Sequence, residues 1–307
     1  MAERHDPLDP NHLIDHVKDS TSFHVPRFLA PDHGGHLELP VFYEGEPLAF
    51  ASDPTGLGLI APLDLRPTRY MVLEVVAAVL IALVFIAFSM RIKNGRLPKG
   101  RLANLLESML LFIRDQVARP AIGHHDADRF VPFLWTLFFF VLACNLLGMV
   151  PWLGSPTGAI ATTGALAFST FCVVVGSGMK KLGVVGFWKA QIPHMDLPGP
   201  MAIFIKPMVF AIEVLGLFIK HFVLAVRLLA NMAAGHLVLA VLVGFVGAVA
   251  YVGSADSYSD GLFWLVSIPS VFGAAALSLL ELFVAFLQAY IFTFLSALFI
   301  GAAVHPH

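Results

Sequence analysis

Two apolar tracts in the C-terminal third, residues 201–252 and 262–302, are too long to be ordinary membrane spans. As single helices at about 1.5 Å per residue they would measure roughly 75 Å and 60 Å, whereas the hydrocarbon core of a bilayer is about 30 Å thick. A helix so much longer than the hydrocarbon core must be strongly tilted in the membrane, broken, or both. Polar side chains on such helices need a partner other than lipid on at least one side. We therefore expect a protein partner beside these two tracts.

The rest of the composition also indicates a membrane protein. Of the 307 residues, 58% are hydrophobic and only 13% are charged, whereas a soluble domain has about 25% charged residues. The formal net charge of -2 provides no broad basic field, so we expect no nucleic-acid partner.

The order of apolar and charged segments predicts the topology. Residues 1–69 form a polar N-terminal segment, and residues 70–90 form the first span. Five basic residues follow within residues 91–101, and such clusters stay in the cytoplasm, which places the N-terminus outside and the C-terminus inside. Residues 101–127 mix apolar and charged positions, as expected for a helix at the inner interface. The transmembrane domain, residues 70–302, is expected to have spans at about 70–90, 130–150, 157–179, 201–252 and 262–302.

We therefore expect an all-α, polytopic fold of about five to six helices. Two of them are long and strongly tilted, and one is interfacial. No repeat of fixed period is visible in the sequence, which argues against a transporter built from two similar halves.

Metal and cofactor chemistry find little support in the residues. The six histidines of the N-terminal segment have no compact ligand spacing, which favours a solvated segment over a metal site. Cys144 and Cys172 lie in apolar runs and fit neither a disulfide framework nor a zinc pattern. We expect no metal and no cofactor.

The most informative polar residues lie in the first long tract. Glu213, Lys220 and Arg227 are seven residues apart, so each is displaced by only about 20° from the last, and Asn231 lies one turn beyond Arg227. Arg227 is the costly member, because an arginine at a helix centre costs about 2.5–3.5 kcal/mol on the insertion scale. It either snorkels, pairs with a buried acid or serves a function, and the absence of an acid three or four residues away favours the last reading.

A second set of polar residues can exchange protons. His236 lies nine residues after Arg227, which turns it to the opposite side of the helix. Glu281 and Gln288, seven apart in the last tract, share a face. An imidazole and a carboxylate titrate, whereas Arg227 does not. Taken alone, His236 could equally be a satisfied core histidine, and Glu281 could be a snorkelled or neutral acid. Glu74, near the outer end of the first span, fits a boundary or packing residue better than a proton relay.

These residues fit an ion pathway better than a catalytic centre. No HExxH motif, nucleophile elbow or Cys/His constellation lies in the spans. A self-contained ion channel or secondary transporter remains the alternative to a subunit of a larger machine.

Several segments resemble the membrane subunit a of F-type ATP synthases. The segment RLLANMAAGH, from Arg227 to His236, is similar to that family's hallmark around its essential arginine. LELFVAFLQAYIFTFLS resembles its C-terminal hallmark, and PFLWTLFFFVLACNLLGMVP, with Asn145, resembles its second span. The resemblance covers nearly the whole chain, and its specificity resides in the last hundred residues.

The resemblance implies a role for each matching position. Arg227 matches the arginine that faces the carboxylate of the rotating c-ring, and Asn231 and Gln288 match its polar neighbours. Glu213 and Lys220 match charged positions on the cytoplasmic side of the ion path. His236 and Glu281 hold the imidazole and the acid in the order found in mitochondrial members, the reverse of some bacterial ones.

The implied protein is a stator subunit with two proton half-channels that couple proton transport to c-ring rotation during ATP synthesis. It would carry no ATP-hydrolysing or ATP-synthesising site of its own. Its expected partners are the c-ring, the b-subunit peripheral stalk, other ATP synthase subunits, protons and the lipid bilayer, in a bacterial inner membrane. The transported ion is either H⁺ or Na⁺, because the binding carboxylate lies on another chain.

Overall fold

The computed structural model describes residues 22–24, 36–38, 68–92, 100–150, 153–192, 199–253 and 260–305. Its five longest helices end within three residues of the ranges expected from the sequence, and all five are long and apolar enough to cross a membrane. These are α2 (Arg69–Ile92), α5 (Ala127–Gly148), α6 (Ile160–Leu182), α8 (Gly199–Gly253) and α9 (Asp260–Val304). The shorter elements are β1 (Ser22–His24), β2 (His36–Glu38), α3 (Arg101–Phe112), the π-helical turn η2 (Ile113–Ala118), α4 (Arg119–Ile122), the 3-10 turn η3 (Pro156–Gly158) and α7 (Val184–Ala190).

The structure confirms the all-α, polytopic class. The only strands in the described residues are β1 and β2, three residues each, which pair antiparallel with Phe23 opposite Leu37. Most of the expected N-terminal segment, residues 1–69, lies outside the described residues. The connector after α6 contains one element that the sequence analysis did not foresee, the short helix α7.

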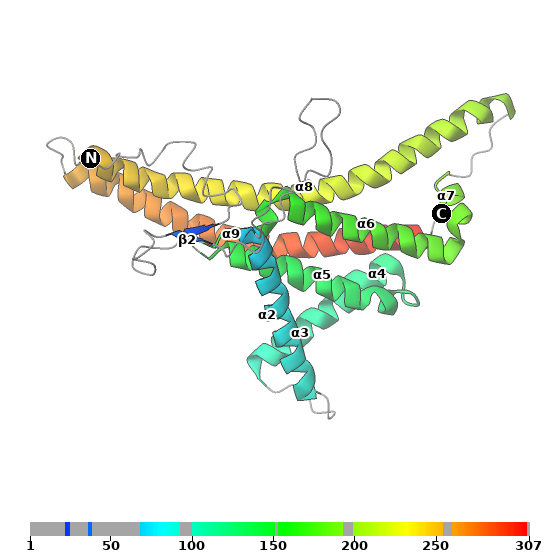
Figure 1. The fold of residues 1–307 in the computed structure, drawn as a ribbon, viewed down its shortest axis with the longest axis horizontal. Helices are drawn as coiled ribbons and strands as arrows, with labels where there is room; N and C mark the ends of the chain where they lie inside the picture. Colours follow the sequence, from blue (N-terminus) through cyan, green and yellow to red (C-terminus); the bar gives the residue numbers. More distant parts are fainter. Residues whose placement is uncertain are drawn as a thin grey trace.

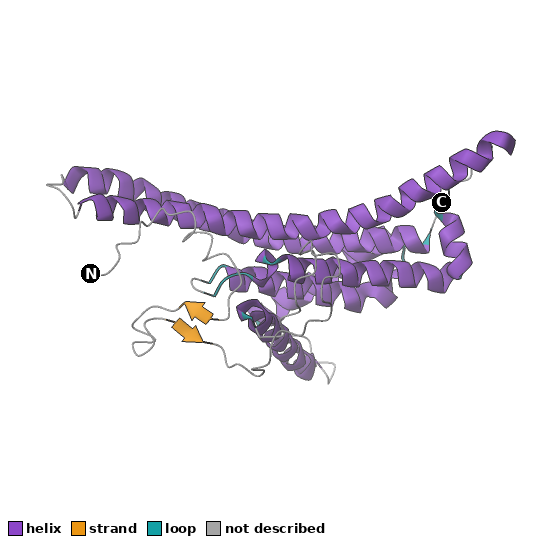
Figure 2. Ribbon diagram, turned by 45° about the horizontal axis from the view of Figure 1, so that its top comes forward, coloured by secondary structure: helices purple, strands orange, loops and turns teal. Residues whose placement is uncertain are grey.

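The two long tracts form single helices. With 55 and 45 residues, α8 and α9 span roughly 80 Å and 70 Å. They lie side by side and antiparallel, and α5 and α6 run along them (Figure 1). Helix α2 stands at a steep angle to this group in both views (Figures 1 and 2). If α2 crosses the bilayer along its normal, the other four long helices are strongly tilted from that normal.

The segment expected at the interface is a continuous helix from residue 101 to residue 122 that contains a π-helical turn. α3 passes directly into η2 and then α4, so its backbone is π-helical over six residues. Arg114 and Asp128 form an ion pair at 3.0 Å, and Trp135 donates its indole N–H to the carbonyl oxygen of Leu110 at 3.0 Å. These contacts fasten the segment to α5.

The core of the fold lies where α4, α5, α6, α8 and α9 meet, and it depends on close helix approach. α9 touches α4 at Gly301, where an added Cβ would overlap the carbonyl oxygen of Ala121. Small residues of this kind let helix backbones approach where lipid offers no hydrophobic drive.

We expect Gly301→Ala to destabilise the fold by about 1–3 kcal/mol, because α4 and α9 must move apart to admit the methyl group. A lowered Tm of the detergent-solubilised chain would show this. Gly216→Ala in α8 is the matched control, since nothing lies within 4 Å of its Cβ position. Equal Tm values for the two variants would contradict the packing described here.

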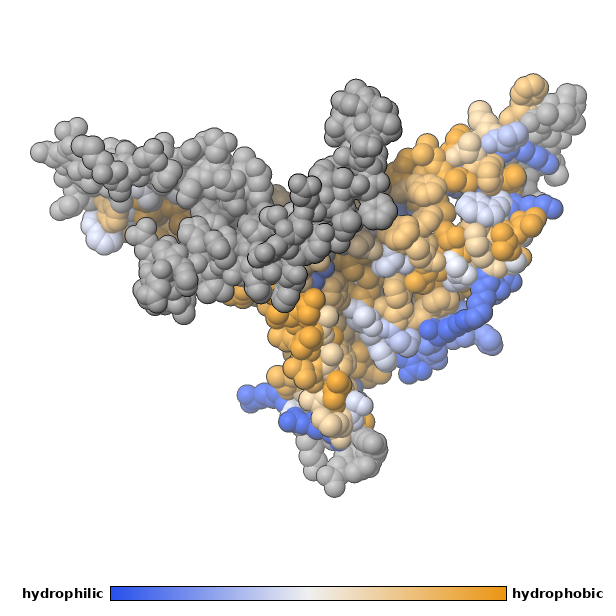
Figure 3. Space-filling view, viewed as in Figure 1, coloured by the Kyte–Doolittle hydropathy of each residue, from blue (hydrophilic) through white to orange (hydrophobic). Residues whose placement is uncertain are grey.

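Basic residues lie at the C-terminal ends of α2 and α6. Figure 3 shows hydrophilic residues at the lower end of α2 and along the lower right rim, with mostly apolar surface between them. Basic residues at these ends include Arg91, Arg101, Lys180 and Lys181. The apolar surface between them includes many exposed aliphatic and aromatic side chains, as expected of a lipid-facing belt.

Candidate functional site

Two polar contacts join α8 to α9 midway along the pair. The amide of Asn231 donates to Oε1 of Gln288 at 2.8 Å. One and a half turns further along α8, Nδ1 of His236 lies 2.9 Å from Oε1 of Glu281. Together these four residues form what we term the α8–α9 polar seam. The structure therefore brings together two pairs that lie 57 and 45 residues apart in the chain.

The His236–Glu281 pair is the titratable part of this seam. The Glu281 side chain is 6% exposed and that of His236 is 18% exposed. Burial of a carboxylate is costly unless a hydrogen bond or an opposite charge satisfies it. His236 supplies the hydrogen bond to Glu281. A proton can pass between an imidazole and a carboxylate at this separation.

Gly235 makes room for the pair. A Cβ at this position would lie 2.9 Å from Oε1 of Glu281 and 3.2 Å from its carboxyl carbon. On the facing helix, Ala285 and Ala289 are fully buried and small. The close approach of α8 and α9 at this pair therefore depends on the absence of a side chain at residue 235.

A groove of about 250 Å³ opens beside Glu281. Asn231, Gly235 and Val238 line it from α8, and Leu277, Glu281 and Val284 line it from α9. The Glu281 side chain therefore forms part of the lining of this groove.

Asn145 fixes the position of α9 next to the seam. Its side chain is fully buried and donates to the carbonyl oxygen of Ala285 at 3.2 Å. Thr157 in turn donates to Oδ1 of Asn145 at 2.8 Å and contacts Ser155 at 2.8 Å. This network ties the α9 turn between Glu281 and Gln288 to α5 and η3.

Arg227 lies one turn from Asn231 and on the outer surface of α8. Its side chain is exposed, as are its apolar neighbours Phe222 and Val223. It forms no ion pair with any carboxylate in the part of the chain that the structure describes. Because residue 227 lies near the middle of the 55-residue helix, the molecule presents an unpaired cation in an apolar surface.

The other predicted site residues lie apart from the seam. Lys220 is exposed and Glu213 is half-buried, both in the half of α8 that precedes Arg227. At 1.5 Å per residue, Glu213 lies about 21 Å before Arg227 and His236 about 14 Å after it. Arg227 thus divides the polar residues of α8 into two groups.

Sequence reasoning missed His221. It is 4% exposed, donates from Nδ1 to the Leu217 carbonyl oxygen at 2.8 Å, and packs against the rings of Phe171 and Phe299. Its position was visible in the sequence, since 217, 221, 224 and 228 follow the helical repeat of an inward face. The histidine occupies a core position of α8 between α6 and α9.

No cluster of three His, Cys, Asp or Glu side chains that could hold a metal ion occurs within the described residues. Of the histidines in the N-terminal segment, only the backbones of His24 and His36 are described.

Comparison with known proteins gives consistent matches. The model of the family "ATP synthase A chain" matches residues 71–301. "ATP synthase subunit a" of Myxococcus xanthus is 43% identical over 248 residues, which are 80% of this chain and 76% of that protein. "ATP synthase subunit a" of Chloroherpeton thalassium is 40% identical over 80% of this chain and 68% of its own length. For "ATP synthase subunit a" of an Anaeromyxobacter species the identity is 39%, and the shares are 80% and 56%.

Proposed function

Because the chain belongs to the ATP synthase A chain family and is a multi-pass membrane subunit of an ATP synthase, we propose that it is the stator against which the c-ring turns. The observation that carries this proposal is Arg227, an exposed and unpaired cation on the apolar outer face of α8. A guanidinium does not shed its proton, so in a membrane it requires an anionic partner. A carboxylate on the rim of a rotor ring supplies that partner.

Two half-channels lead to this point. The positive-inside rule places the basic ends of α2 and α6 in the cytoplasm, with the N-terminus outside and the C-terminus inside. α8 begins after α7 on that side, so Glu213 and Lys220 belong to the cytoplasmic half-channel. His236 and Glu281 belong to the outer half-channel, and the groove beside Glu281 is its inner end.

Arg227 couples the two half-channels through the ring. A rotor carboxylate that arrives protonated releases its proton near the guanidinium, because an opposite charge favours the ionised form. The same cation repels a proton that would otherwise pass directly from one half-channel to the other. Protons therefore cross only when the ring turns. The driving energy is about 2.3 kcal/mol per charge for each 100 mV.

The remaining partners follow from the same assignment. The protein would be held against the ring by the b-subunit peripheral stalk in a bacterial inner membrane, and the ion would be a proton. Its titratable pair supports this choice, since His236 and Glu281 form a proton-exchanging pair rather than an oxygen-only cation site. The nucleotide chemistry would take place on other subunits.

Reconstitution into vesicles separates this function from that of a self-contained channel or transporter. We expect no proton flux from the purified chain alone, and flux once the c-ring and stalk subunit are added. Vesicles that contain only the ring and the stalk serve as the control. Flux from the chain alone, equal to that of the full set, would contradict a stator role.

A further inference from the structure

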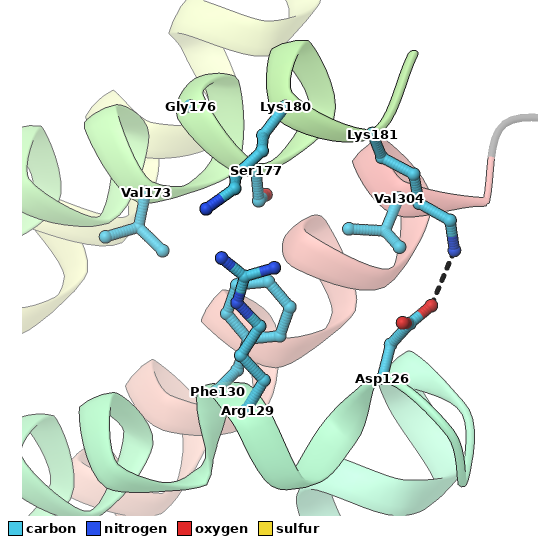
Figure 4. A pocket seen from close by; sticks show the side chains of 9 residues that line it. All are labelled: Asp126, Arg129, Phe130, Val173, Gly176, Ser177, Lys180, Lys181 and Val304. Atoms are coloured by element: carbon cyan, nitrogen blue, oxygen red, sulfur yellow. Dashed lines mark hydrogen bonds and ion pairs between the residues drawn. The ribbon is translucent and has the colours of Figure 1, made fainter.

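A second polar cavity lies where α5 begins and α6 and α9 end, and Arg227 does not line it. Its volume is about 450 Å³, within the range of about 300–1,000 Å³ typical of small-ligand sites. The side chains that line it include Arg129 and Phe130 of α5, Ser177, Lys180 and Lys181 of α6, and Val304 of α9 (Figure 4).

Two cations of this cavity face each other. Figure 4 shows the guanidinium of Arg129 and the ammonium of Lys180 pointing toward one another into the open space. Neither is paired with a carboxylate within the described ranges. Both side chains are exposed, and two like charges that point into the same space repel, so this arrangement favours an anion between them.

The nearest acid is already engaged. Asp126 accepts a hydrogen bond from Lys181 at 2.5 Å and lies 3.2 Å from Nε2 of His305. The hydrogen bond from Lys181 holds the pKa of Asp126 below its ordinary value, so this carboxylate stays ionised and bound to Lys181. Of the three cations that line the cavity, Arg129 and Lys180 are left uncompensated.

We propose that this cavity binds a phosphate group between Arg129 and Lys180. A guanidinium offers a planar fork that matches two phosphate oxygens, and an ammonium adds a compact point charge. The hydroxyl of Ser177 donates to the Val174 carbonyl at 2.9 Å, so the two cations are the donors available to the ligand. This site involves none of the residues assigned to proton transport.

The position of the cavity favours the headgroup of an anionic phospholipid as the source of the phosphate. The cavity lies at the ends of three membrane helices, α5, α6 and α9, and its lining includes the apolar side chains of Phe130, Val173 and Val304 (Figure 4). Basic pockets at the cytoplasmic ends of membrane helices suit such headgroups. Free phosphate has the same binding chemistry and is the competing source.

Phosphorus NMR of the purified complex tests the site with both sources. The probes are dihexanoyl phosphatidylglycerol, dihexanoyl phosphatidylcholine and inorganic phosphate, and line broadening reports binding. We expect the anionic dihexanoyl phosphatidylglycerol to bind best of the three probes. The double variant Arg129→Gln and Lys180→Gln should bind it at least about tenfold more weakly than the parent protein does. Lys189→Gln is the matched control, because this exposed cation of α7 does not line the cavity.

A second variant guards against a loss of binding through misfolding. Arg129→Glu places a carboxylate opposite Lys180, so the two side chains can pair with each other and we expect the fold to be kept and binding to be lost. If inorganic phosphate binds as tightly as phosphatidylglycerol and displaces it, the site is supported and its ligand is free phosphate rather than a lipid headgroup. Equal binding of all probes by the parent and both variants would overturn the proposal.

Discussion

Replacing Arg227 by alanine is expected to abolish coupled ATP synthesis while the complex still assembles. The side chain is exposed and forms no ion pair with residues of its own described chain, so its removal leaves no buried group unpaired. It does remove the permanent positive charge that, in the proposed function, separates the two half-channels. We expect the rate of ATP-driven proton pumping in inverted vesicles to fall by at least about a hundredfold. A fall of this size corresponds to an activation barrier that is roughly 2.7 kcal/mol higher.

Two further variants test whether a loss of pumping is specific to the guanidinium of Arg227. Arg101→Ala removes an exposed arginine of the interfacial helix α3 and is expected to pump normally. Arg227→Lys keeps a cation, but an ammonium in an apolar site loses its proton more readily than a guanidinium, so most of the pumping should still be lost. Robust pumping by Arg227→Ala in fully assembled complexes would refute the role of this residue.

Glu281→Gln is expected to slow proton entry from the outer side by about tenfold or more. Glutamine is nearly the same size as glutamate, so the contact with His236 can remain while the exchangeable proton of the carboxyl group is lost. The measurement is passive proton flux through the membrane sector under an imposed diffusion potential. Glu107→Gln in α3 is the matched control, since it lies outside the α8–α9 polar seam.

The exchange of the two side chains gives a sharper test. His236→Glu alone places two acids side by side, and Glu281→His alone places two imidazoles, so each should slow the flux. The double variant restores one acid and one imidazole across a contact of 2.9 Å, and we expect it to recover much of the flux. A double variant that is slower than both single variants would mean that the two positions do not act as a pair.

The sequence was sufficient for the large features of the fold. The tracts 201–252 and 262–302 predicted two helices longer than a bilayer is thick, and the structure has them as α8 and α9. The seven-residue spacing of Lys220 and Arg227 predicted a shared face, and both side chains are exposed. Helical periodicity and hydropathy are local properties, so they can be read from one chain.

The contacts between helices were not accessible in the same way. The pairs Asn231–Gln288 and His236–Glu281 depend on the axial register of α8 against α9, which the close approach at Gly235 helps to set. Register is a tertiary property, and hydropathy does not fix it. The π-helical turn η2 and the helix α7 were missed for a similar reason, because contacts with neighbouring helices define them more than composition does.

His221 shows a different kind of omission. The stripe predicted from the sequence contains Lys220 and Arg227, which are both exposed. The inward face of the same helix carries His221, which is buried against two aromatic rings. The helical spacing of residues 217, 221, 224 and 228 places this histidine on the inward face.

The most direct test of the stator function is a map of the assembled complex in the membrane at side-chain resolution. The proposal places the Arg227 guanidinium within the hydrocarbon layer and about 4–6 Å, or one bridging water, from a carboxylate of the nearest ring subunit. An Arg227 that lies among lipid headgroups, with every acid of the ring facing another surface of the protein, would contradict it.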